Sequence, residues 1–182
     1  LFFGNYGQLQ SLTLLRINQL NLPANGTVDS ARLTLFIRRI HGDSTSIVKP
    51  AVHALSREWN EENISWEQFE EEALLGDALN INSFQSDSGK VILSLPPELI
   101  QSWMDATISD NFGICISYDQ QDSGFMFECN SRDYSGTTAF PQFSFDMSYD
   151  TTSQVYHVTP TSDGYIAKRD QESSSDRLFV AN

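Results

Sequence analysis

Short segments in which apolar and polar residues alternate dominate this sequence and limit the folds that it can adopt. In ARLTLFIRRI (residues 31–40), Leu33, Leu35 and Ile37 occupy every second position, which is the period of a strand with one buried face. Comparable segments, separated by turn residues, lie at 11–20, 47–55, 90–95, 113–118, 124–129 and 141–147. Many short strands with few helices predict an all-β fold, a jelly-roll β-sandwich with one or two short helices and a C-terminal extension strand.

Two segments depart from the strand pattern and are predicted to be helical. Residues 66–79 (WEQFEEEALLGDAL) combine good helix formers with an acidic first part, which suits a helix N-terminus. Residues 96–107 (PPELIQSWMDAT) begin with proline, which the first turn of a helix tolerates. Four apolar residues of this second segment share one side of the helix: Leu99, Ile100, Trp103 and Met104.

The charge of the chain argues against two classes of partner. With 24 acidic and 11 basic residues, the net charge of −13 repels phosphate backbones and anionic lipid, so we expect neither nucleic acid nor membrane-surface binding. No apolar run approaches the roughly 20 residues of a membrane span. Sequons at Asn25 (NGT) and Asn63 (NIS) are candidate glycosylation sites. They fit an extracellular or cell-surface protein, which is the location we expect.

Two cysteines lie in consecutive predicted strands. Cys115 in GICISY and Cys129 in GFMFEC flank a short polar loop, so the segment is predicted to form a β-hairpin. In the symmetric register the two cysteines face each other, at a Cβ separation close to that of a disulfide. Two unrelated buried thiols are the alternative.

No group of residues has the spacing of a catalytic or metal site. His41, His53 and His157 fall in a predicted turn, a strand and a linker, without metal-ligand spacing. We therefore predict that the protein is not an enzyme and needs no cofactor. A Ca²⁺ ion held by loop acids such as Asp119 and Asp122 is the alternative.

Several aromatic residues could serve either the fold or a sugar ligand. We expect Trp59 and Trp66 to brace a turn against the core rather than to stack on sugar rings. Arg132 is expected to form an ion pair inside the fold, with contact to an acidic sugar as the alternative. For glycan contact, Tyr134 and Phe140 beside Arg132 are the better aromatic candidates.

The chain divides into a main body and a tail. We predict a β-sandwich domain over residues 1–149, a polar linker over 150–162, and a strand segment over 163–182. The last five residues, LFVAN, resemble the first five, LFFGN. Such an echo is expected if the polypeptide is one unit of a chain, or of an assembly, that repeats itself; a chance match is the alternative.

The body resembles the DNRLRE-domain family, which is related to disaggregatase-type and carbohydrate-binding jelly-roll modules. The resemblance is carried by SARLTLFIRR, VKPAVHALSREWNEENISWEQ, SWMDATISDNFGICISYD and FECNSRDYSGTTAFPQFSF, in that order. It covers roughly residues 1–147 and implies a jelly roll and carbohydrate binding. Members of the family usually begin with a strand of the type A-D-x-Y-I, which this chain carries instead near its end, in SDGYIAKRD.

Relative to the resembled family, the boundaries of this chain are shifted by one strand. We therefore predict that the sandwich formed by residues 1–147 lacks one strand. A sheet edge with unpaired N–H and C=O groups invites strand addition. We therefore expect the tail of one copy to complete the next, head-to-tail. The residues expected to carry this assembly are Gly164, Tyr165, Ile166, Ala167, Lys168, Leu178, Phe179 and Val180.

The predicted function is that of a structural subunit or repeat of an extracellular filament, with copies of itself as partners. A non-catalytic carbohydrate-binding module, with polysaccharide as partner, is the alternative.

Overall fold

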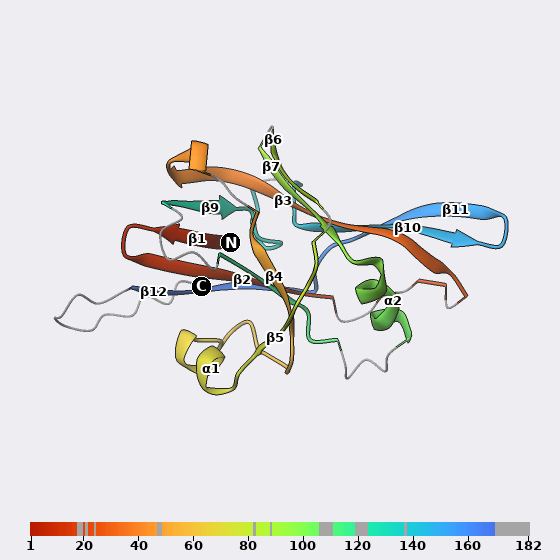
Figure 1. The fold of residues 1–182 in the computed structure, drawn as a ribbon, viewed down its shortest axis with the longest axis horizontal. Coiled ribbons are helices and arrows are strands. Elements are labelled where there is room, and N and C mark those ends of the chain that lie inside the picture. Colours follow the sequence, from red (N-terminus) through yellow and green to blue (C-terminus); the bar gives the residue numbers. More distant parts are fainter. Residues whose placement is uncertain are drawn as a thin grey trace.

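A computed structural model describes residues 1–182 except 18–19, 21, 24, 47–48, 82, 88, 106–110, 119–123, 137 and 170–182. It contains a short 3₁₀ turn (Ser44–Ser46), helices α1 (Trp66–Glu71) and α2 (Pro97–Asp105), and antiparallel strands. The strands are β1 (Phe2–Tyr6), β2 (Leu9–Arg16), β3 (Thr27–Gly42), β4 (Ala51–Leu55), β5 (Leu75–Ala78), β6 (Ser83–Asp87), β7 (Lys90–Leu95), β8 (Ile114–Ser117), β9 (Phe125–Cys129), β10 (Gln142–Tyr149), β11 (Thr152–Val158) and β12 (Ser162–Arg169). The prediction of an all-β sandwich is confirmed (Figure 1). No described helix is long and apolar enough to span a membrane.

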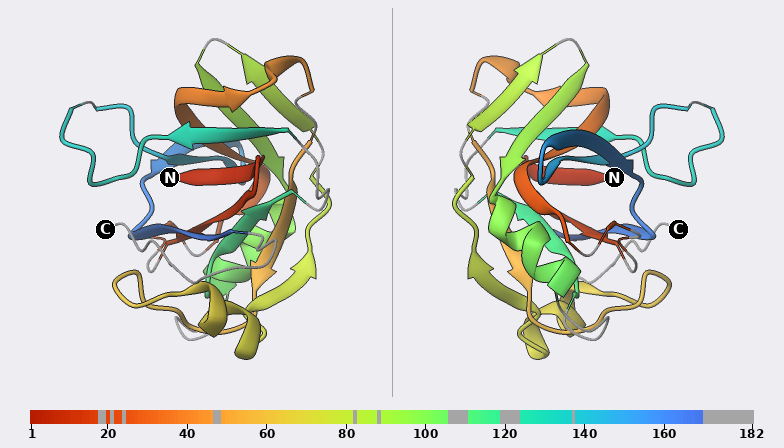
Figure 2. Two further views of the ribbon diagram at one scale, coloured as in Figure 1. Left: turned by 90° about the vertical axis from the view of Figure 1, so that its left-hand side faces the viewer. Right: turned by 90° about the vertical axis from the view of Figure 1, so that its right-hand side faces the viewer.

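The long strand β3 belongs to both layers of the sandwich. Its first half pairs with β10 and β7, and its second half pairs with β9 after a register shift between Ile37 and Arg39. Along the first layer the order is β11-β10-β3-β7-β6, and from β3 the second continues as β9-β1-β2-β8-β4-β5. β3 therefore carries the chain from one layer to the other (Figures 1 and 2).

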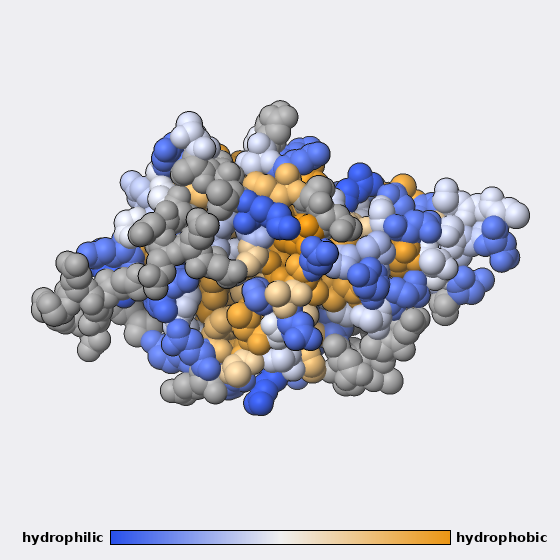
Figure 3. Space-filling model, in the orientation of Figure 1, coloured by the Kyte–Doolittle hydropathy of each residue, from blue (hydrophilic) through white to orange (hydrophobic). Residues whose placement is uncertain are grey.

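A main core fills the space between the layers. The alternation predicted for residues 31–40 is realised, since Leu33 and Leu35 are fully buried there. Ile100 of α2 is also fully buried, with Leu99 and Trp103 packed against the same core, which confirms the predicted apolar side of this helix. On the face drawn in Figure 3, apolar surface gathers in the middle, and the right-hand end of the molecule is mainly hydrophilic.

A second, smaller core lies between β2, β8 and β12 on one side and residues 59–74 on the other. Its buried members are Leu12, Leu14, Leu55, Trp59, Ile64, Trp66, Phe69, Leu74, Cys115 and Ile166. Trp59 and Trp66 are only 5% and 7% exposed, as expected for indoles that brace a turn. Ser65 caps α1 by accepting the Gln68 N–H at 3.2 Å.

Two predicted boundaries are wrong. The helix expected over 66–79 ends at Glu71, because Leu74 turns into the second core and residues 75–78 pair with β4 instead. Ala73 makes the break, with a φ of 48°. The expected linker over 150–162 contains β11, which pairs with β10 from Thr152 to Val158. Only residues 159–161 connect β11 to β12.

The predicted cysteine hairpin is also wrong. β8 pairs with β2 and β4, while β9 pairs with β1 and β3. Ile114 and Ile116 point into the main core, so Cys115 between them points the other way, into the second core. Cys129 lies in the main core. The two cysteines are not bonded to each other, because a sheet layer separates them.

Candidate functional site: the β12 docking site

The C-terminal strand occupies an edge of its own molecule. β12 is antiparallel to β2 over eight residue pairs, from Ser162 opposite Arg16 to Arg169 opposite Leu9 (Figure 1). This corrects the expectation that the sandwich of a single chain is left one strand short. The edge of β2 does require a partner strand, and a three-residue connection lets residues 162–169 of the same chain reach it.

We define the β12 docking site as β2, the second core beneath it, and Arg132. Ile166 lies opposite Leu12, is 4% exposed, and completes the second core. The Ser11 hydroxyl donates to the Ile166 carbonyl at 3.0 Å. At the far end, Lys168 Nζ lies 4.5 Å from the centre of the Trp66 ring. Apolar burial and main-chain pairing thus both hold the strand.

On the other face of β12, the middle of the strand is less buried than Ile166. The Tyr165 ring lies 4.9 Å from that of Phe2, and both side chains are half-buried. Among the described strands, β12 pairs with β2 alone. It can therefore leave or enter its place without breaking the pairing of any other strand.

Arg132 ties the beginning of β12 to two other segments. Its main-chain N–H donates to Asp163 Oδ2 at 2.7 Å, and its guanidinium donates to the Thr161 carbonyl. The same guanidinium donates to Glu61 Oε2 at 2.9 Å and lies 3.6 Å from Asp133 Oδ2. The residue expected to form an ion pair inside the fold does so, at the junction of the loop after β9, the loop before α1, and β12.

Burial and crowded negative charge make this cluster unusual. The Asp163 side chain is 1% exposed, and its Oδ1, which no hydrogen bond satisfies, lies 3.5 Å from Arg132 Nε. Desolvation raises the pKa of Asp163, although the Arg132 N–H and guanidinium oppose the rise. Desolvation also raises the pKa of Glu61, against the attraction of Arg132. Carboxylate oxygens of Glu61, Asp133 and Asp163 lie within 4.8 Å of one another, with the guanidinium among them as the cation.

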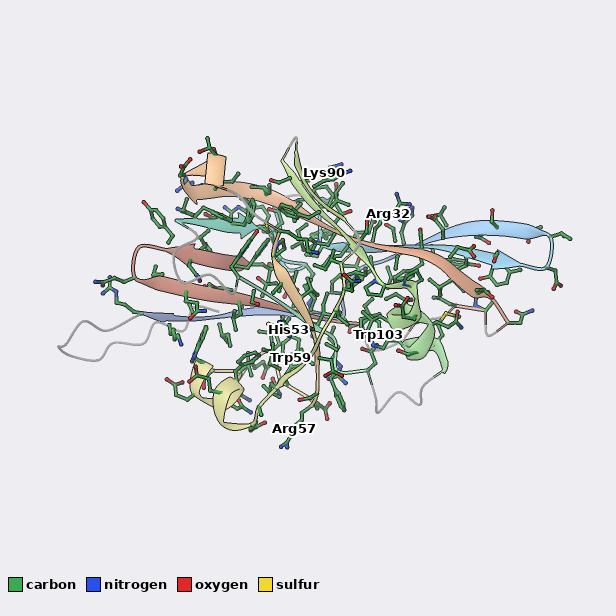
Figure 4. All side chains as sticks on the ribbon, in the orientation of Figure 1. Arg32, His53, Arg57, Trp59, Lys90 and Trp103 are labelled. Atoms are coloured by element: carbon green, nitrogen blue, oxygen red, sulfur yellow. The ribbon has the colours of Figure 1, made fainter. Side chains whose placement is uncertain are left out.

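An open depression of about 630 Å³ adjoins the cluster. It is lined by Glu58, Trp59, Asn60, Glu61, Glu62, Gln68 and Ser162. Trp59 lies between the strands and the α1 segment, on the opposite side of the molecule from Arg32 and Lys90 (Figure 4). Its indole N–H is used inside the fold, donating to the Phe112 carbonyl at 2.9 Å. The lining offers carboxylates and amides but no lysine or arginine.

The other residues considered for a glycan do not form one site with Arg132. Tyr134 is 37% exposed and lies under the guanidinium of Arg38, 4.4 Å from ring centre to Cζ. Phe140 is half-buried. The sequon residues Asn25 and Asn63 are exposed in turns, where a glycan has room.

The histidines have separate partners, as their spacing indicated. His41 lies 3.1 Å from Glu128, His53 3.2 Å from the Gly76 carbonyl, and His157 2.9 Å from Ser144. The proposed Ca²⁺ ligands Asp119 and Asp122 lie outside the described residues, as do the expected assembly residues Leu178, Phe179 and Val180.

Sequence reasoning missed Asp163 and Glu61 as partners of Arg132. The available signal was an acid in the sequence SDGYIAK, two residues before Tyr165 and three before the buried Ile166. A carboxylate near the start of an otherwise half-buried strand needs a partner, and Arg132 was the basic residue already expected to form an ion pair inside the fold.

The fold and the site together define a class: an all-β, sandwich-like module with a separable edge strand. No family model, curated protein or solved structure matches the chain.

Proposed function

We propose that the protein is a non-catalytic structural module of an extracellular or cell-surface assembly, whose copies are linked head-to-tail by exchange of β12. The observation that carries the proposal is that β12 pairs, among the described strands, with β2 alone and is joined to β11 by the short connection 159–161. In the single chain it fills its own docking site. In an assembly it fills the identical site of a neighbour.

Exchange preserves the contacts that hold the strand. The β2 pairing, the burial of Ile166 and the Arg132 interactions are the same whether β12 comes from the same chain or another. The equilibrium then depends on the chain concentration and on the strain in the connection. Pro160 lies in this connection and restricts its conformations. An exchange that does not close on itself generates a filament.

The register supplies a direct test. Gln10 lies opposite Lys168, so cysteines at these positions come within disulfide range. Gln10→Cys and Lys168→Cys are made in separate chains, mixed under reducing conditions and then oxidised. Exchange predicts a covalent heterodimer on a non-reducing gel, at a yield that rises with protein concentration.

The matched control mixes Gln10→Cys with Val155→Cys, because Val155 is 49% exposed on β11 and far from the β2 edge in the pairing order. The heterodimer yield of this control mixture measures disulfides that form by random collision of two chains. Equal yields in the two mixtures at every concentration would refute exchange. The two cysteines in one chain give the intramolecular disulfide as a reference for the register.

A second candidate is a carbohydrate-binding module, which the depression beside Trp59 favours. Its carboxylates and amides are suited to sugar hydroxyls, and the lack of a lining cation favours neutral rather than acidic glycans. Affinity electrophoresis in gels that contain neutral polysaccharides tests it. Glu62→Gln should weaken retardation, whereas Glu98→Gln on the exposed side of α2 should not. No retardation in any gel would exclude this candidate for the polysaccharides used.

A further inference from the structure

The contacts around Arg132 join two parts of the chain that strand exchange would separate. Arg132 and Glu61 belong to the body that accepts the strand. The supplied segment contributes Asp163 from β12 and Thr161 from the connection that precedes it. Every contact named here between the acceptor residues and the supplied residues involves a charged side chain. The strength of these contacts therefore changes when a side chain gains or loses its charge, whereas that of apolar packing does not.

The charge balance of the cluster is unfavourable for docking at neutral pH. Three carboxylates, Glu61, Asp133 and Asp163, surround one guanidinium, and Asp163 is buried. Asp133 repels both other acids, and the Leu1 amine adds a weaker attraction for Asp163. Docking of β12 therefore brings a carboxylate out of water to a site that already holds an excess of negative charge.

We propose that the Arg132 cluster is a charge-dependent latch for β12: Arg132 recognises the acid that precedes the buried isoleucine of an incoming strand, and the carboxylates packed around it make docking of that strand stronger at acidic pH than at neutral pH. The partner that fits the site is an antiparallel strand with the pattern Asp-x-x-Ile, as at Asp163 and Ile166. Applied to a strand from a second copy, the latch rests on the proposed exchange. Applied to the chain's own strand, it does not.

The direction of the pH effect follows from the direction of the pKa shifts. In the docked structure, the pKa of Asp163 and that of Glu61 both lie above their ordinary values, mainly because of desolvation. A raised carboxyl pKa stabilises the docked state fully below the pKa of the free group, and this contribution is lost as pH rises through the docked value. Docking is therefore expected to weaken from acidic toward neutral pH.

Hydrogen–deuterium exchange of the full chain, at a concentration where it is monomeric, tests the latch. Protection of the β12 amides, corrected for the intrinsic pH dependence of exchange, is compared at pH 4.5 and pH 7.5. Arg132→Gln leaves Asp163 buried without its cation, so protection at pH 7.5 should fall by roughly 10- to 100-fold. Acidification should restore most of it, because the protonated Asp163 needs no cation.

Two further variants complete the test. Arg32→Gln removes an exposed ion pair with Asp146 on the other layer and should leave β12 unchanged. Asp163→Asn removes one of the two carboxyls with a raised pKa, so its β12 protection should respond less to pH than that of the wild type. Protection of β3 amides shows that each variant remains folded.

The latch is refuted if the β12 amides of Arg132→Gln are as well protected at pH 7.5 as those of the wild type. It is also refuted if the loss of β12 protection in this variant is the same at both pH values. A global loss of protection in Arg132→Gln that acid does not restore also counts against it. The hydrogen-exchange measurement is made on the monomer and does not depend on strand exchange. Absence of cysteine-linked heterodimers would therefore overturn strand exchange without affecting the test of the latch.

Discussion

Replacing Ile166 with alanine removes the buried anchor that β12 contributes to the second core. The side chain is 4% exposed and contacts a cluster that includes Leu12 and Trp59. Deleting a buried isoleucine side chain to alanine costs about 2–5 kcal/mol. An edge strand can relax more readily than a central one, so we expect the lower half of this range, about 2–3 kcal/mol. That corresponds to roughly a 30- to 150-fold weaker docking equilibrium.

Hydrogen exchange shows which strands lose stability in this variant. Amides of β12, and those of β2 that face it, should lose protection, while amides of β3 and β10 in the other layer should keep theirs. Val155→Ala is the control, because that side chain is 49% exposed on β11 and its truncation should change stability by no more than about 0.5 kcal/mol. Equal protection of β12 in Ile166→Ala and wild type would show that the strand is not held by this contact.

Three further predictions concern the body of the fold. Gly113 and Gly89 both have positive φ, but a Cβ at Gly113 would lie 2.1 Å from the Leu15 carbonyl oxygen, whereas a Cβ at Gly89 would meet open space. The urea midpoint of Gly113→Ala should therefore lie well below that of Gly89→Ala. Equal midpoints would contradict the geometry. Burial raises the pKa of Cys129 to about 12, so maleimide should label this thiol only after denaturation, and rapid labelling of the native protein would place Cys129 elsewhere. Ser65→Ala should cost about 1 kcal/mol in chemical denaturation through loss of the α1 cap, and an unchanged midpoint would mean that the cap does not contribute.

Much of the local structure could be predicted from residue order alone. The alternation at Leu33 and Leu35 and the apolar side of residues 96–107 could be read directly from the sequence. Each pattern shows which side of the segment is buried, and it is the same whatever core that side contacts. The strand segment predicted over residues 163–182 is realised in part, as β12. The helix over 66–79 was overestimated because its good helix formers could not reveal that Leu74 would be drawn into a core.

The sequence by itself determined that the chain is largely a set of short strands, one of them near its end. The tertiary structure decided which strands pair. Cys115 and Cys129 sit in consecutive strands that do not pair, while Ser162 and Arg16, far apart in the sequence, lie opposite each other. Strand propensity is a local property that is the same for every partner, whereas pairing depends on which edges and faces remain uncovered after the rest of the chain has folded.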